Sequence, residues 1–216
     1  MTLSQSLLLR HSRLCHGCCH RLSSSRPSSS DQKTVRIGCS SGFWGDTATS
    51  VPQLVYKGNI QYLVSDYLSE ITMSLLAAVK NKKPELGFTP DFLESTAPHL
   101  AEIKKRGIRL VTNGGGINAP ACVAMLKQLS KKAGVEFSIA EVTGDDMMAH
   151  MAELEKQGIK EMFSGKPFPS TINSMNAYYG AGPILTALNR GADIVVTGDD
   201  TNIEHSITDQ CARSCH

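Results

Sequence analysis

Two acidic side chains follow one apolar segment closely enough to act together. Asp66 comes directly after the β-prone run Ile60 to Ser65, and Glu70 comes one residue after Ser69, a good helix-capping residue. Two neighbouring carboxylates can differ in protonation, one ionised and one protonated, which suits acid–base chemistry. Asp66 and Glu70 are therefore the predicted catalytic residues. The alternative is structural, with Asp66 capping the helix and Glu70 stabilising its dipole.

A glycine turn joins another β-prone run, Ile108 to Val111, to a segment with apolar residues at helical spacing. Pro120 suits the first turn of that helix, because its missing N–H would have no partner there. Glycines at such a junction let an anion approach the amides at the helix N-terminus. The turn predicts a site for a phosphate or a thioester oxygen, and a purely structural turn is the alternative.

Aromatic and amide side chains extend this set. Trp44, the only tryptophan, and Asp46 lie in a loop after the first predicted strand. Trp44 and Phe43 can form the floor of an apolar or adenine pocket, with burial of Trp44 in the core as the alternative. The predicted ligand-binding residues are Trp44, Asp46, Asn113, Gly114, Gly115, Gly116 and Asn118. Cys122 falls on the apolar stripe of its helix and is expected to be buried and inert.

The glycines also fit G-x-G-x-x-A loosely, and Glu141 follows at about the distance where a dinucleotide fold places its ribose-binding acid. A nicotinamide-dependent dehydrogenase is thus one alternative function. The sequence assigns no cofactor.

The elements that position these residues alternate between strands and helices. Five β-prone runs are predicted as strands, at residues 35–39, 60–65, 108–111, 135–142 and 192–197. Helical patterns separate them, including one after Ser69 with a predicted buried stripe of Ile71, Leu75, Ala78 and Val79. This alternation predicts an α/β, Rossmann-like fold with a mainly parallel sheet and helices on both faces. Ligands bind such sheets beyond the carboxyl ends of the strands.

The first 33 residues differ in composition from the rest. They contain four arginines and many serines, and no acid precedes Asp31. This is typical of a mitochondrial presequence, with a disordered tail as the alternative, so the predicted location is the mitochondrial matrix or else the cytoplasm. Residues 34–198 form the predicted α/β domain, and residues 199–216 an irregular tail.

Charge and cysteine usage narrow the function further. Beyond residue 30 the chain keeps 18 basic residues against 20 acidic ones, so charge gives no case for nucleic-acid binding. No apolar run is long enough for a membrane span. Cysteine spacing favours neither a disulfide framework nor metal binding, although Cys15, Cys18 and His20, and Cys211, Cys215 and His216, are possible zinc ligands.

Several segments, taken in order, resemble the acyclic terpene utilisation protein A family. They are VRIGCSSGFWGD (35–46), YLVSDYLSEITMSLLA (62–77), GFTPDF (87–92), the glycine turn with NAPAC (118–122) and YYGAGPILTALNRGADIVVTG (178–198). The resemblance implies a role in catabolism of acyclic terpenes such as citronellol and geraniol, through branched acyl-CoA intermediates and beside a geranyl-CoA carboxylase. It implies no catalytic residues.

We therefore expect a small-molecule ligand, a CoA ester or similar anion, bound at the strand-end rim. A non-catalytic partner of acyl-CoA carboxylase subunits is the alternative from another class. Family members look longer than this chain, whose last residues have no strand or helix pattern. This difference predicts a truncated, inactive form. The substrate, the reaction and the oligomeric state do not follow from the sequence.

Overall fold

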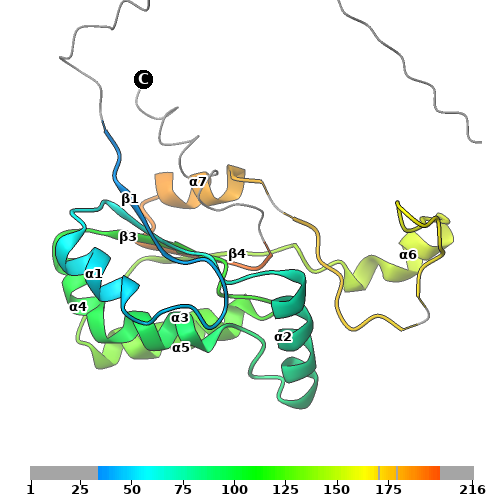
Figure 1. Cartoon of the computed structure of the whole chain (residues 1–216), viewed down its shortest axis with the longest axis horizontal. Coiled ribbons are helices and arrows are strands. Elements are labelled where there is room, and N and C mark those ends of the chain that lie inside the picture. The colour runs from blue at the N-terminus through cyan, green and yellow to red at the C-terminus, as the bar shows by residue number, and fades with distance from the viewer. Residues whose placement is uncertain (1–33, 170, 179, 200–216) are drawn as a thin grey trace, which may run out of the picture. The chain divides into compact units, whose positions relative to one another are not determined.

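The structure is a computed structural model that describes residues 34–169, 171–178 and 180–199. At its centre lies a five-stranded, all-parallel sheet in the order β1-β2-β3-β5-β4 (Figure 1). The strands are β1 (Ile37–Ser41), β2 (Tyr62–Ser65), β3 (Arg109–Thr112), β4 (Ile139–Val142) and β5 (Ile194–Thr197). All five coincide with predicted strands, and the α/β, mainly parallel fold is confirmed.

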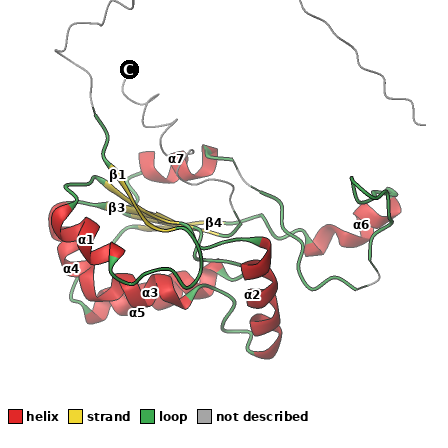
Figure 2. Ribbon diagram, viewed as in Figure 1, coloured by secondary structure: helices red, strands yellow, loops and turns green. Residues whose placement is uncertain are grey.

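The helices are α1 (Ser50–Lys57), α2 (Glu70–Lys82), α3 (Pro90–Thr96), α4 (Leu100–Arg106), α5 (Ala119–Lys132), α6 (Met151–Lys156) and α7 (Gly182–Asn189). Two short 3-10 helices, η1 (Ala97–His99) and η2 (Met148–His150), precede α4 and α6. Figure 2 shows α1, α3, α4 and α5 on one face of the sheet and α7 on the other. Helices therefore cover both faces, as predicted.

Strand order explains why α7 lies on the opposite face of the sheet from α1 and α5. The chain moves in one direction from β1 through β3 to β4, and then turns back to insert β5 between β3 and β4. Right-handed crossovers keep the connections of a forward-moving chain on one face and send a returning connection to the other. The returning connection is α7, and the forward ones include α1 and α5.

Each face has its own apolar core. The larger core joins Leu63 of β2 and Leu110 of β3 to Val55, Phe92 and Leu126 of α1, α3 and α5. The smaller core joins Val64, Val111 and Val195 of the sheet to Ile184 and Leu188 of α7. Because adjacent strand residues alternate between the two cores, both faces need apolar side chains, which explains the unbroken apolar runs of the sequence.

Pro98 and Gly107 determine the form of the connection to β3. Pro98 lies in η1, between α3 and α4, where a proline interrupts the helical hydrogen bonds, as the sequence predicts. Gly107 ends α4 with φ 65°, a left-handed conformation that favours glycine. Ile108 follows and leads into β3, which begins at Arg109, one residue after the predicted start of this strand.

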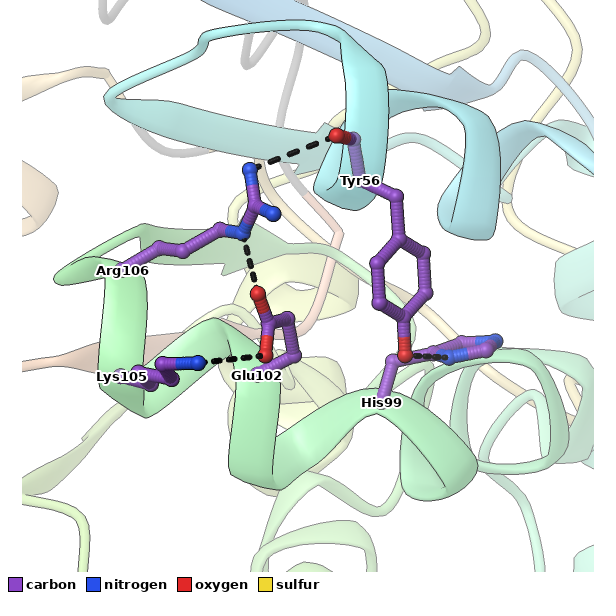
Figure 3. A network of polar contacts seen from close by, with 5 residues as sticks. All are labelled: Tyr56, His99, Glu102, Lys105 and Arg106. Carbon is purple, nitrogen blue, oxygen red and sulfur yellow. Dashed lines mark hydrogen bonds and ion pairs between the residues drawn. The ribbon is translucent and has the colours of Figure 1, made fainter.

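A polar network holds α1 against α4 (Figure 3). Arg106 Nη1 donates to the Tyr56 carbonyl at 3.4 Å, and Arg106 Nε lies 2.5 Å from Glu102 Oε1. The Tyr56 hydroxyl lies 3.4 Å from His99 Nδ1. The hydrogen bond from Arg106 is the largest cause of a lowered pKa at Glu102. These exposed contacts orient the two helices, while the core beneath them provides most of the stability.

Two predicted helix faces are wrong. Helix α2 buries Thr72, Met73, Leu76 and Ala77, and it turns the predicted stripe outward, with Ile71 74% exposed and Leu75 51% exposed. The helical spacing of Met147, Met151 and Leu154 also predicts an apolar face for the segment that contains α6, but α6 has no buried residue. In both cases the apolar spacing was correct for a helix but did not determine which neighbour it packs against.

The predicted presequence and the predicted tail, residues 199–216, lie outside the described residues except for Asp199, and so do the two cysteine and histidine groups named above. The localisation therefore stays a prediction. No helix in the described part of the chain is long and apolar enough to cross a membrane.

Candidate functional site

At the carboxyl end of the sheet, a buried amide contacts Asp66, one of the two predicted catalytic residues. Asn113, 1% exposed, directly follows β3. Its Oδ1 accepts from the backbone N–H of Tyr67 at 2.8 Å, and its Nδ2 donates to Asp66 Oδ1 at 2.6 Å. Asn113 thus fixes the loop after β2 and orients the Asp66 carboxyl; its predicted role in ligand binding stays a prediction.

The cap of α2 is Ser69, not Asp66. Ser69 Oγ accepts from the Thr72 N–H at 3.2 Å, which satisfies one of the unpaired amides of the first turn. Asp66 instead accepts from the Leu68 N–H at 3.4 Å, and Glu70 occupies the first turn of α2 with its side chain exposed. The capping alternative for Asp66 is therefore wrong, and the dipole role of Glu70 is compatible with its position.

Two further carboxylates join this end of the sheet, and sequence reasoning did not select them as site residues. Asp145, 8% exposed, follows β4, and Asp199 follows β5. Asp145 Oδ2 accepts from Asn176 Nδ2 at 2.9 Å and from the Asp199 N–H at 3.0 Å. These bonds join the loops after β4 and β5 to residue 176, which lies far along the chain.

Asp199 has the most perturbed carboxyl of the group. Its pKa is raised to about 6, first by burial and then by the negative charges of Asp145, Glu70 and Asp66. Tyr178 lies close enough for Asp199 to raise the pKa of its phenol, which keeps the hydroxyl protonated. We call Asp66, Glu70, Asp145 and Asp199 the carboxylate cluster. A group that titrates near neutral pH beside a protonated hydroxyl can transfer protons under physiological conditions.

The cluster is not arranged around one ion. Among the described residues, no group of three or more His, Cys, Asp or Glu side chains could hold a metal ion. Asp199 directly follows the strand-ending glycine, Gly198, and the convergence of strand ends in a parallel sheet places it at this rim from the sequence, although it was not among the predicted site residues. Nothing local predicts the burial of Asp145, which depends on Asn176.

The glycine turn is close-packed against the protein itself. A Cβ on Gly116, whose φ is +54°, would lie 2.5 Å from Leu76 Cδ1 and 2.7 Å from the Gly87 carbonyl. A Cβ on Gly114 would lie 3.1 Å from Phe92 Cβ, and one on Gly115 would lie 2.8 Å from Ala119 Cβ. These contacts account for the glycines by packing.

The amides of the turn are also used internally. Gly114 N–H donates to Thr112 Oγ1 at 2.9 Å, and Gly116 N–H donates to the Asn113 carbonyl at 3.0 Å. Asn118 is at the N-cap position of α5, but its Nδ2 donates to the carbonyls of Pro84 and Leu86. The anion site predicted for this turn stays a prediction, and the same residues have a structural role.

Trp44 and Asp46 lie beside a pocket at the end of β1. Trp44 Nε1 donates to Asp91 Oδ1 at 3.0 Å, which ties the loop to the start of α3. The pocket has a volume of about 190 Å³ and is lined by Ser41, Asp46, Thr47, Ala48, Tyr67, Asp91, Glu94 and Ser95. Burial is the main reason that the pKa of Tyr67 is raised. The hydroxyls and carboxylates that line the pocket suit a ligand group that is polar and uncharged, or cationic.

A β-bulge in β1 helps to form the wall of this pocket. The pairing of β1 with β2 shifts between Cys39 and Ser41, so that Ser40 is the extra residue. Ser40 Oγ lies 2.7 Å from Ser65 Oγ, and both side chains are buried. The shift places Ser41 at the pocket wall. Sequence reasoning found the loop but not the bulge.

A second pocket adjoins the carboxylate cluster. It has a volume of about 360 Å³ and is lined by Lys80, Asn81, Pro84, Ile117, Asp146, Met148, Asn173, Ser174 and Asn176. Asn176 belongs to both places, because it lines this pocket and donates to Asp145. We call it the amide pocket. It offers amide donors and one lysine within the same region as the titratable carboxyl.

Glu141 and Cys122 complete the predicted residues. Glu141 is exposed on β4, which β5 separates from the strand that carries the glycine turn, whereas dinucleotide folds pair the two corresponding strands. This geometry weakens the dehydrogenase alternative. Cys122 is buried, and burial raises the pKa of its thiol to about 12, which makes it unreactive as expected.

The fold and the site together define an α/β protein with a cluster of acids at the carboxyl ends of parallel strands. The family model for acyclic terpene utilisation family protein AtuA matches residues 35–201, which is more than half of the chain. The protein belongs to this family. The match agrees with the resemblance of the sequence segments.

Searches of curated proteins and of solved structures found no matching relative.

Proposed function

We propose that the protein acts in acyclic terpene utilisation by transferring a proton to or from a branched acyl thioester, with Asp199 as the acid–base group. The observation that carries this proposal is the raised pKa of Asp199, about 6, within a cluster of four carboxylates. Family membership supports the substrate class. The neighbouring Tyr178 hydroxyl is the candidate donor to a developing oxyanion.

Charge defines which part of the ligand meets the cluster. A free carboxylate would be repelled by Asp66, Glu70, Asp145 and Asp199, whereas a thioester carbonyl is neutral. The anionic remainder of a CoA ester fits better in the amide pocket, where Lys80 and three asparagine side chains lie beside a single carboxylate, Asp146. The sequence-based expectation of an anionic ligand is thereby refined, with a neutral reacting group at the cluster and negative charge beyond it.

The test separates binding from chemistry. We would follow thermal unfolding of the full chain with citronelloyl-CoA, with free citronellic acid and with CoA, and then monitor exchange of the thioester α-protons in D₂O by NMR. A raised midpoint with the thioester but not the free acid is expected, because a ligand that binds the native state stabilises it. We expect Asp199→Asn to retain this shift and to lose exchange by ~100-fold or more.

Glu141→Gln serves as the matched control. It removes an exposed carboxylate at the same end of the sheet but outside the cluster, so exchange should match the wild-type rate. If the thioester produces no shift, or Asp199→Asn exchanges protons normally, the proposal is wrong. A shift with NADH that Glu141→Gln abolishes would instead favour the dehydrogenase.

A further inference from the structure

The outward face of α2 carries an apolar seam that the described protein leaves uncovered. Ile71 is 74% exposed, Leu75 is 51% exposed, and Ala78 is also exposed. With Lys82 they repeat at spacings of four, three and four residues, the pattern of helices that pack side by side. We call Ile71, Leu75, Ala78 and Lys82 the outer seam. The opposite face of α2 is buried, so the helix is anchored and the seam is held rigid.

The charges of α2 are separated along its length. Glu70 lies in the first turn and Lys82 in the last, followed by Lys83. Among the described residues, none of these three side chains takes part in a salt bridge. A parallel neighbour would bring like charges together, whereas an antiparallel copy of the same helix would place each acid beside a lysine.

Side-chain sizes also fit an antiparallel copy. When the two helices are centred between Leu75 and Ala78, each Leu75 faces Ala78 of the partner subunit, a large residue opposite a small one. Each Ile71 then meets the aliphatic part of Lys82 of the partner subunit, which can cover apolar surface while its ammonium stays in water. A two-fold axis makes one self-complementary strip sufficient for both copies.

We propose that two copies of the chain associate through antiparallel pairing of their α2 outer seams, and that each copy thereby supplies lysine charge to the other's carboxylate cluster. Glu70 belongs to both the cluster and the end of the seam. Pairing brings Lys83 of the partner subunit next to Glu70, so a cation approaches the acidic end of α2. This inference does not depend on the proposed proton transfer.

Sedimentation equilibrium of the full chain over a range of concentrations tests the proposal. We expect a mass that approaches twice the chain mass of 23.3 kDa as concentration rises. One pair of 13-residue helices is small beside the roughly 1,200 Å² of typical stable interfaces, so dissociation on dilution is expected. Leu75→Glu should weaken dimerisation on the order of 100-fold, because it buries unpaired charge.

Met125→Glu is the matched control, since Met125 is 41% exposed on another helix, α5, and should leave the dimer intact. Ile71→Gln is a second, milder variant at a more exposed position, and far-UV circular dichroism checks that each variant is folded. A wild-type chain that stays monomeric at all concentrations overturns the proposal. The proposal is also overturned if Leu75→Glu and Ile71→Gln are both folded and both dimerise as the wild-type chain does.

Charge reversal distinguishes antiparallel pairing from other contacts. Glu70→Lys alone should weaken the dimer, and so should Lys82→Glu with Lys83→Glu, because each places like charges together. Combining all three substitutions should restore the wild-type mass distribution. Failure of this rescue would show that the seam does not pair with itself in the antiparallel sense. Masses are measured without any ligand, so the outcome is separate from that of the proton-exchange experiment.

Discussion

Asp199 holds its proton more tightly than an ordinary aspartate. Its pKa is raised from 3.8 to about 6, chiefly by burial and then by the negative charges of Asp145, Glu70 and Asp66. Between these values the folded protein binds more protons than the unfolded chain, so stability falls as pH rises through this window. The ionised Asp199 side chain therefore destabilises the folded protein at neutral pH. Its protonated form, which is present below about pH 4, does not.

Removing this charge should stabilise the protein in a pH-dependent way. We expect Asp199→Asn to raise the free energy of unfolding at pH 7 by about 1–2 kcal/mol, after allowance for solvent screening of a half-buried group. The difference from wild type should shrink to near zero at about pH 4. Urea unfolding at several pH values measures it. Glu141→Gln should follow the wild-type curve, and a loss of stability in Asp199→Asn at pH 7 would contradict the argument.

Some residues of the site were predictable one by one and others were not. Asp66 and Asn113 each follow a strand, so the rule that strand ends converge was enough to place them in one region, and a 2.6 Å hydrogen bond joins them. Asp145 follows its strand as well, but its burial requires Asn176, which approaches from a later loop. No local pattern specifies such a long-range contact.

At the scale of elements, the glycine turn makes a stability prediction. Gly116→Ala should lower the free energy of unfolding by about 2–4 kcal/mol, because φ +54° is unfavourable for alanine and the new Cβ would lie 2.5 Å from Leu76 Cδ1. Gly42→Ala is the control, since a Cβ there meets nothing within 4 Å. It should change stability by less than about 0.5 kcal/mol. Thermal or urea unfolding compares the two, and equal effects would argue against close packing of the turn.

Helix α2 shows where element prediction reached its limit. Apolar residues occur on two sides of this helix, so the pattern was compatible with burial of either one. The inner side is selected by contacts outside the helix, where Leu76 meets the glycine turn and Lys80 Nζ donates to the Ile117 carbonyl at 2.6 Å. Gly116, the residue that permits this approach, is 40 positions further along the chain.

For the whole molecule, alternation of strands and helices was enough to predict a parallel sheet, but not its order. The sequence contains five strand-like runs, and no single run indicates that β5 pairs with both β3 and β4. Insertion of β5 between them buries Ile194, Val195 and Val196 completely. The continuous apolar run at residues 194–196 is the sequence feature that indicates a central, fully buried strand.

The same strand order has a consequence for the protein while it is being made. Within the described sheet, β4 pairs only with β5, which a ribosome synthesises about 3–10 s later at rates of ~5–20 residues per second. During that interval β1, β2 and β3 can already pair, whereas β4 has exposed hydrogen-bonding groups on both sides. Limited proteolysis of released chains truncated at increasing lengths should show residues 139–142 becoming protected only when β5 is included. Earlier protection would mean that β4 finds a temporary neighbour. The last strand of the described sheet to be synthesised is thus the one that joins β4 to the other strands.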